Sequence, residues 1–114
     1  MDINDFSEFK IEVYLPPENL EEIRLALYEA NAGVVENYDN VFATMDVTGH
    51  WRPLKGANPY LGETGKLEVA SEIKLEINCN KEYVAKVLQA IRNHHPYEVP
   101  LIRVIPILNE YFGD

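Results

Sequence analysis

The sequence predicts an α+β protein with a ferredoxin-like βαββαβ fold, in which a four-stranded antiparallel sheet carries two helices on one face. Apolar and polar residues alternate in some segments, as in half-buried strands, and recur at helical spacing in two others. The order is strand, helix, strand, strand, helix, strand, which is that of a split βαβ arrangement. No linker or repeat interrupts this order, so we expect residues 1–114 to form a single domain.

The first strand and the first helix have clear patterns. The alternating apolar residues of the strand are Phe9, Ile11, Val13 and Leu15. Pro16 and Pro17 end it, because proline fixes φ and lacks the amide hydrogen. The apolar residues at helical spacing are Leu20, Ile23, Leu27 and Ala30, preceded by Glu18, Glu21 and Glu22. Asn31-Ala32-Gly33 closes this helix, and Gly33 is predicted to be its left-handed cap.

The second and third strands are predicted to be long. Alternation returns over residues 38–48, with one face formed by Val41, Ala43, Met45 and Val47. It continues after a loop in Leu67, Val69, Ile73, Leu75 and Ile77, with the polar Ser71 as a break. We expect these strands to form an extended hairpin that projects beyond the sheet. Asn78-Cys79-Asn80 is predicted to form a turn or a helix cap.

The second helix and the last strand complete the pattern. The helix is marked by Val84, Val87, Leu88 and Ile91. His94-His95-Pro96 ends it, because a proline disfavours the helical conformation of the residue before it. Residues 101–108 are apolar on both faces and are predicted to form the last strand. Pro106 places this strand at an edge of the sheet or ends its pairing early.

Composition restricts the classes of function. A chain of 114 residues that is 46% hydrophobic and 25% charged is typical of a soluble globular protein, and no apolar run reaches the roughly 18–20 residues of a membrane span. The formal net charge of −9 disfavours nucleic acids and anionic membrane surfaces as partners. Cys79 is the only cysteine, which excludes an intramolecular disulfide. The acidic first residues do not resemble a secretory signal, so we expect a cytoplasmic location.

Residues 49–65, GHWRPLKGANPYLGETG, are unlike the rest of the chain. They contain four of the six glycines, two of the seven prolines and the only tryptophan, Trp51. Glycine serves where the backbone needs positive φ or a close approach, and proline restricts φ. This composition predicts a long loop of specific shape that is anchored by Trp51.

This loop and the HPYEVP segment, residues 95–100, supply the candidate ligand-binding residues. They are His50, Trp51, Arg52, Lys55, Asn58, Tyr60, Lys66 and Tyr97. The basic members could bind an anion together with glycine amides, although no P-loop motif is present. The aromatic members could stack on a ligand or fill an oligomer interface, and we favour the interface. A loop that seals a subunit contact is the preferred interpretation, with anion binding as the alternative.

A metal site and a catalytic site are the other hypotheses. His95 and Glu98 are candidate metal ligands, because imidazole and carboxylate suit divalent ions. Neighbouring helical side chains diverge, however, so His94 and His95 are poorly placed to share an ion. The simpler interpretation is that His95 packs at the helix end. Asp39, Glu63, Glu68 and Glu98 give no sign of converging, so we assign no catalytic residues and predict that the chain is not an enzyme.

Several runs of residues carry a resemblance to a known family. The runs are GVVENYD at 33–39, GHWRP at 49–53, GANPYLGE at 56–63, GKLE at 65–68 and HPYE at 95–98. With the predicted element order, they resemble the CutA and PII-like superfamily. The resemblance is strongest to the PII-like domain inserted in GTP cyclohydrolase I type 2-like proteins, the dinuclear-metal hexamer family. Classical CutA shares the last run and lacks the glycine-proline loop.

The resemblance implies a function as well as a fold. In the larger family the metal ligands lie in two halves that flank the inserted domain, and neither half is present in this sequence. The resemblance therefore implies a non-catalytic regulatory or accessory domain, assembled as a homotrimer through its sheets and hairpins. A small ligand would then bind at clefts between subunits. The alternatives are a divalent-metal-binding protein of the CutA cation-tolerance type and a module that docks onto a separately encoded enzyme.

Overall fold

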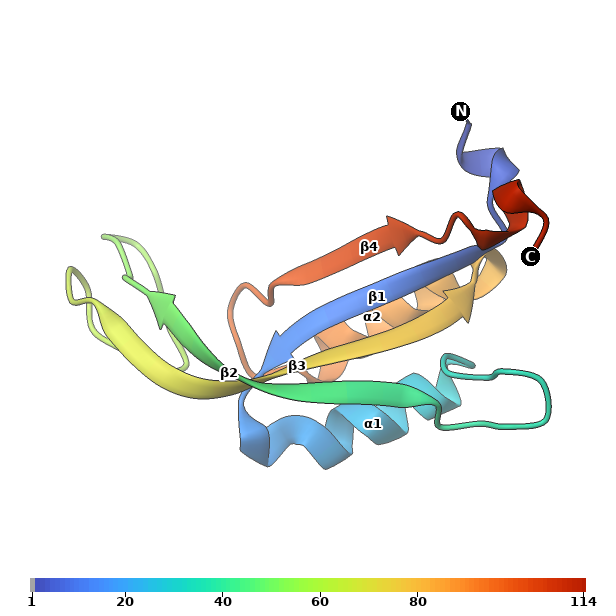
Figure 1. Cartoon of the computed structure of the whole chain (residues 1–114). Coiled ribbons are helices and arrows are strands. Elements are labelled where there is room, and N and C mark those ends of the chain that lie inside the picture. The colour runs from blue at the N-terminus through green and yellow to red at the C-terminus, as the bar shows by residue number, and fades with distance from the viewer. Residues whose placement is uncertain (1) are drawn as a thin grey trace.

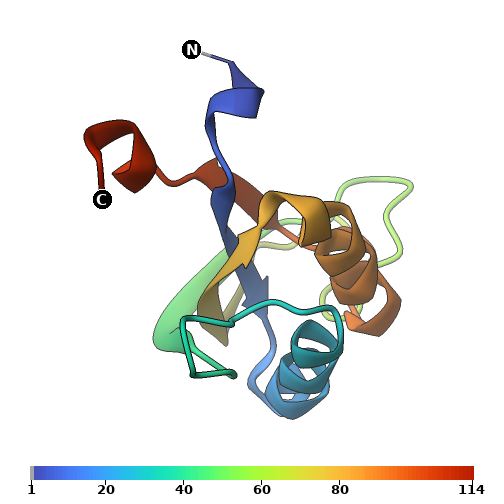
Figure 2. The ribbon, with the colours of Figure 1, turned by 90° about the vertical axis from the view of Figure 1, so that its right-hand side faces the viewer.

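The computed structural model describes residues 2–114, and its core is a four-stranded sheet. The strands are β1 (Glu8–Leu15), β2 (Phe42–Trp51), β3 (Glu68–Asn80) and β4 (Ile102–Pro106), and the helices are α1 (Leu20–Glu29) and α2 (Val84–His94). The sheet order is β2-β3-β1-β4 with all neighbours antiparallel. Both helices cover the same face of the sheet (Figures 1 and 2). The ferredoxin-like prediction is therefore confirmed.

The hydrophobic core lies between the helices and the central strands β1 and β3. Along β1 the side chains alternate strictly between buried and partly exposed positions, as its sequence predicts. Ile11, Val13 and Leu15 are fully buried and pack with Leu75 of β3. The helices contribute Ile23, Leu27, Val87 and Ile91 to the same cluster. Within the described residues, no helix is long and apolar enough to span a bilayer.

The end of α1 corrects one prediction. Asn31, with φ of 69°, takes the left-handed position that directly follows the helix, and the amide of Ala32 donates to the carbonyl of Leu27 at 3.0 Å. Gly33 also has positive φ (76°), but it joins the loop to the sheet: its amide donates to Asn78 O at 2.8 Å. A Cβ at Gly33 would lie 2.8 Å from Ile77 Cδ1. Gly33 is thus required for close packing rather than for the cap.

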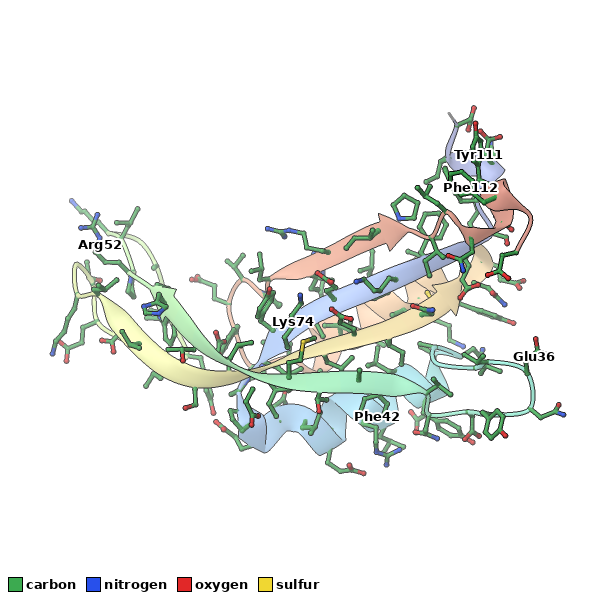
Figure 3. All side chains as sticks on the ribbon, viewed as in Figure 1. Glu36, Phe42, Arg52, Lys74, Tyr111 and Phe112 are labelled. Atoms are coloured by element: carbon green, nitrogen blue, oxygen red, sulfur yellow. The ribbon has the colours of Figure 1, made fainter. Side chains whose placement is uncertain are left out.

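In β2, the residue that packs against the core does not belong to the apolar face predicted from the sequence. Phe42 lies opposite Ile77, so Phe42 is the residue of β2 that packs against the core (Figure 3). Ala43, Met45 and Val47 do share one face, as predicted, but it is the face without helices. Since β2 is an edge strand, its even-numbered residues after Phe42 extend beyond the helices and are exposed.

The β2–β3 hairpin differs from the prediction at both ends, since β2 begins at Phe42 rather than at residue 38 and both strands end later than predicted. β2 continues through Trp51, so the irregular loop begins at Arg52 rather than at Gly49. β3 continues through Cys79, which is paired with Phe9 and buried, so the predicted turn at residues 78–80 is wrong. β1 pairs with β3 only as far as Ile73. Beyond that residue the hairpin leaves the sheet and bends (Figure 1), as the predicted projection requires.

The face of the sheet without helices carries an ion network. Lys10 lies 3.0 Å from Glu12, and Lys74 lies 3.5 Å from Glu12 and 3.4 Å from Glu76. Figure 3 shows Lys74 on this open face. β4 forms the other edge of the sheet and ends at Pro106, as predicted. Although β4 is apolar, four of its five residues are exposed.

Candidate functional site

A cleft of about 590 Å³ lies where the bent hairpin, the loop after β2 and the turn after α2 meet. The hairpin contributes residues 49–51 and Glu72, and the loop contributes Arg52, Pro53, Leu54, Ala57, Pro59, Tyr60 and Leu61. The turn contributes residues 97–99 and Leu101, while Tyr14 of β1 completes the lining. The two segments that the sequence distinguishes, residues 49–65 and 95–100, therefore form one concave site.

A chain of hydrogen bonds connects the body of the sheet to the floor of the cleft. The amide of Tyr97 donates to His95 Nδ1 at 3.1 Å. Nδ1 is therefore the acceptor, and the proton lies on Nε2, which donates to Tyr14 O at 2.7 Å. The Tyr97 hydroxyl donates to Glu72 Oε2 at 2.7 Å. Burial and the neighbouring Glu72 carboxylate raise the pKa of Tyr97, so its hydroxyl stays a donor.

Gly49 is placed directly against the Glu72 carboxylate. A Cβ built on Gly49 would lie 1.8 Å from Glu72 Oε1 and 2.6 Å from Glu72 Cδ. No side chain can occupy position 49 unless Glu72 moves. The close approach explains this glycine without any need for positive φ.

Trp51 anchors the loop, as predicted. Its indole Nε1 donates to Leu61 O at 3.1 Å, ten residues further along the chain. The amide of Gly65 closes the base of the same loop on Pro53 O at 2.7 Å. Gly62 has φ of 117°, and a Cβ there would lie 3.4 Å from Trp51 Nε1. The loop therefore has a defined shape that a larger residue at position 62 would disturb.

Two further contacts fasten the loop to the rest of the protein. The amide of Asn58 donates to Glu98 Oε1 at 3.0 Å, and the Tyr60 hydroxyl donates to Glu18 Oε1 at 3.0 Å. The bond to Glu18 raises the pKa of Tyr60. The rings of Tyr60 and Tyr97 lie 5.7 Å apart. Loop and turn thus form one wall of the cleft.

The structure places only some of the predicted ligand-binding residues at the cleft. His50, Trp51, Arg52, Tyr60 and Tyr97 line it. Asn58 contributes its backbone amide to the bond with Glu98. Lys55 and Lys66 are exposed and do not line the cleft. The basic cluster inferred from the sequence is therefore divided, with Arg52 at the far end of the hairpin (Figure 3).

His95 and Glu98, the candidate metal ligands, have other partners. Both ring nitrogens of His95 are hydrogen-bonded to backbone groups, and its side chain is buried at the end of α2. This agrees with the structural interpretation of His95. Glu98 Oε1 accepts a hydrogen bond from the backbone amide of Asn58 in the loop. Within residues 2–114, no three His, Cys, Asp or Glu side chains gather closely enough to hold a metal ion.

Sequence reasoning missed Glu72 and Tyr14. Glu72 is only 8% exposed although it lies in a strand whose odd-numbered residues were predicted to form the apolar face. The signal that could have found it is Ser71, the break in that face. Near Ser71 the hairpin separates from β1, so the residues that are buried change there. A carboxylate beside such a break is a candidate for a site outside the core.

Comparisons with known proteins agree with this architecture. A family model described as CutA1 divalent ion tolerance protein matches residues 60–112. The PII-like protein CutA from Nostoc sp. PCC 7120 superposes with a TM-score of 0.67 over 90% of this chain and 84% of that one, at 22% identity. The chain has the fold of CutA proteins, and residues 60–112 match the CutA1 family model.

The longer relatives show where such a domain also occurs. The GTP cyclohydrolase 1 type 2 homolog of Halalkalibacterium halodurans is 35% identical over 104 residues, which are 91% of this chain and 28% of that protein. The structure of a Bacillus cereus protein related to NIF3 matches with a TM-score of 0.78 and 30% identity, over 90% of this chain and 26% of that one. The chain spans about a quarter of the length of the curated relatives it matches.

Proposed function

We propose that this chain is a non-catalytic regulatory or accessory domain that assembles as a homotrimer and binds a small molecule in the cleft. The observation that carries the proposal is the convergence of residues 49–65 and 95–100 on one cleft of about 590 Å³, a volume in the range of small-molecule sites. Hydrogen bonds and glycine contacts fix the shape of this cleft. The similarity to CutA/PII-like proteins supports a binding role.

Exposed apolar surface supports assembly. Met45 on β2 and Ile105 on β4 lie on the helix-free face and are 41% and 37% exposed. Both edges of the sheet are unpaired within the described residues. Open edges and apolar faces need covering, and a second copy of the chain is the simplest cover. A trimer would place further copies beside the projecting hairpins.

Native mass spectrometry of freshly purified, untagged protein tests the proposal. We expect a trimer that carries an additional mass in stoichiometric amount, which would identify the ligand. A bare trimer would support the assembly and move the search to a protein partner. A bare monomer at micromolar concentration would contradict both the assembly and the ligand.

A divalent-metal-binding role is the second candidate, because the matching family model is described by divalent ion tolerance. His95 would have to give up one backbone hydrogen bond to bind an ion. Copper and zinc titrations of the wild type and of His95→Ala and Glu98→Gln test this role. Equal metal affinity in all three proteins would reject it for these residues.

A module that docks onto a separate enzyme is the third candidate. The relatives in which this domain forms about a quarter of a longer chain support it. A pull-down with the trimer as bait tests it, and retention of the same enzyme in repeated experiments is the expected outcome. The cytoplasmic location stays a prediction from the sequence.

A further inference from the structure

We propose that Glu72 is the anionic floor of a binding site for a cationic amino group, joined to an apolar or aromatic body that fills the cleft. This inference rests on the proposed ligand-binding function and names the chemical class of the ligand. It follows from the burial of Glu72, its partners and the lining of the cleft.

Glu72 is a buried carboxylate without a cationic partner. It is 8% exposed, and its one hydrogen bond within residues 2–114 is the one that Oε2 accepts from the Tyr97 hydroxyl. No lysine, arginine or histidine nitrogen of these residues lies within 4.0 Å of it. Burying a carboxylate is costly unless a positive charge or several donors compensate. An incoming amino group would supply that charge.

The neighbouring cations are committed elsewhere. Lys74 lies on the same face of β3, two residues away, and it pairs with Glu12 and Glu76 and lies over the Tyr14 ring. His95 donates from Nε2 to a backbone carbonyl and accepts at Nδ1, so its ring is neutral. Arg52 and His50 also line the cleft, but both side chains are exposed and neither has a nitrogen within 4.0 Å of Glu72.

The carboxylate is held in a fixed position. Tyr97 binds Oε2, and Oε1 lies against the backbone of Gly49, where any side chain would displace it. Tyr97 is in turn fixed by its amide bond to His95. A binding group that is positioned before the ligand arrives loses less conformational entropy on binding.

The rest of the lining suits an organic cation. Trp51, Tyr60 and Tyr97 present aromatic rings to the cleft, and the faces of such rings attract ammonium groups. Leu54, Pro59 and Leu61 add apolar surface for the body of the ligand. Glu98 adds a second carboxylate, already bonded to the Asn58 amide. The formal net charge of −9 attracts cations from a distance.

The amino group has two available sources. It could belong to a free small molecule, or it could be the ammonium of a lysine side chain of a second copy of this chain that enters the cleft. Both would pair with Glu72 through the same chemistry. The experiment must therefore separate them.

Calorimetric titration with matched probes tests the site. Tyramine carries an ammonium on a phenol ring, and 4-ethylphenol is its neutral counterpart. We expect tyramine to bind at least about tenfold more tightly than 4-ethylphenol, as one charge-assisted hydrogen bond would give. Glu72→Gln should weaken tyramine binding at least about tenfold. Glu76→Gln is the control, because Glu76 lies on the same strand face outside the cleft.

Native mass spectrometry of the same variants identifies the source. Tyramine binding that Glu72→Gln abolishes points to a free ligand. If no probe binds and Glu72→Gln dissociates the assembly while Glu76→Gln does not, a second copy supplies the cation. Equal binding of the two probes, or binding of neither, with an assembly unchanged by Glu72→Gln, overturns the inference. If Glu72→Gln does not fold, the affinities of the wild type for tyramine and 4-ethylphenol still test the inference.

The outcome is separable from that of the proposed function. A trimer that retains a metabolite without a basic nitrogen would leave the proposed function intact and overturn the assignment to Glu72. A bare monomer whose cleft nevertheless binds tyramine through Glu72 would overturn the trimeric assembly and leave the assignment to Glu72 intact.

Discussion

The body of the sheet and the far half of its hairpin are built by different means. In the body, Ile11, Val13 and Leu15 are fully buried and pack between the sheet and two helices. In the far half, Leu67 is 67% exposed and Val69 is 57% exposed. Single hydrogen bonds such as that of Trp51 to Leu61, and close glycine contacts, shape that region instead.

The difference shows which part of the sequence determines which property. The body relies on many interchangeable apolar contacts, so its stability is distributed over several elements. The hairpin and its cleft rely on a few specific contacts, each of which involves residues far apart in sequence. Substitutions in the two regions should therefore lower the free energy of unfolding by different amounts.

The largest expected effect is in the body. Leu75→Ala removes a fully buried side chain and should lower the free energy of unfolding by about 2–5 kcal/mol. Leu67→Ala is the matched control and should change it by less than about 0.5 kcal/mol. Urea denaturation of both variants measures the difference. Equal losses of unfolding free energy would mean that a second copy covers Leu67. They would contradict the proposed difference between the two regions.

A smaller effect is expected at the cleft. Gly49→Ala places a Cβ on Glu72 Oε1 and should cost about 1–3 kcal/mol, because Glu72 must leave its bond to Tyr97. Glu72→Ala in the same chain removes the clash. The double variant should therefore be more stable than the sum of the single effects predicts. Additive losses, measured in the same denaturation assay, would show that Gly49 serves another purpose.

The smallest expected effect is a dependence on pH where the two regions join. Burial lowers the pKa of His95 below its ordinary value of 6.5, although the Tyr14 carbonyl and Glu72 favour the proton. Between the folded and ordinary pKa values the unfolded chain binds more protons, so stability falls as pH decreases below about 6.5. The slope contributed by this residue is at most about 1.4 kcal/mol per pH unit.

His95→Gln measures that slope by comparison. Denaturation between about pH 7.5 and 5.5 should show a weaker pH dependence in this variant than in the wild type. Identical slopes for the wild type and His95→Gln would contradict a neutral, buried His95.

The fold could be predicted from the sequence largely because the body follows simple periodicity. β1, α1 and α2 lie where alternating and helical spacing placed them. The errors occurred where a local rule competed with tertiary structure. Cys79 is flanked by two asparagines, which favour turns, yet pairing with Phe9 holds it in β3. Phe42 rather than Met45 faces the core because the register with Ile77 decides the face.

The site could be located but not assembled from the sequence. The glycine-proline loop and the HPYE run were recognisable because glycine, proline and tryptophan are unusual outside special shapes. The convergence of Glu72, Tyr97 and Gly49 depends on the bend of the hairpin, and spacing in the sequence does not encode it. Lys55 and Lys66 joined the basic cluster by proximity in sequence, but neither lines the cleft in the structure.

The two ends of the chain are fastened to one another. The backbone amide and hydroxyl of Ser7 both donate to the carboxylate of Glu110, and the amide of Ile107 donates to Glu8 O. The first and last described segments therefore lie at one corner of the molecule (Figure 1), beside the exposed rings of Tyr111 and Phe112 (Figure 3). Such a unit can be spliced into a surface turn of a host protein, or circularly permuted through a short bridge, without disturbing its core.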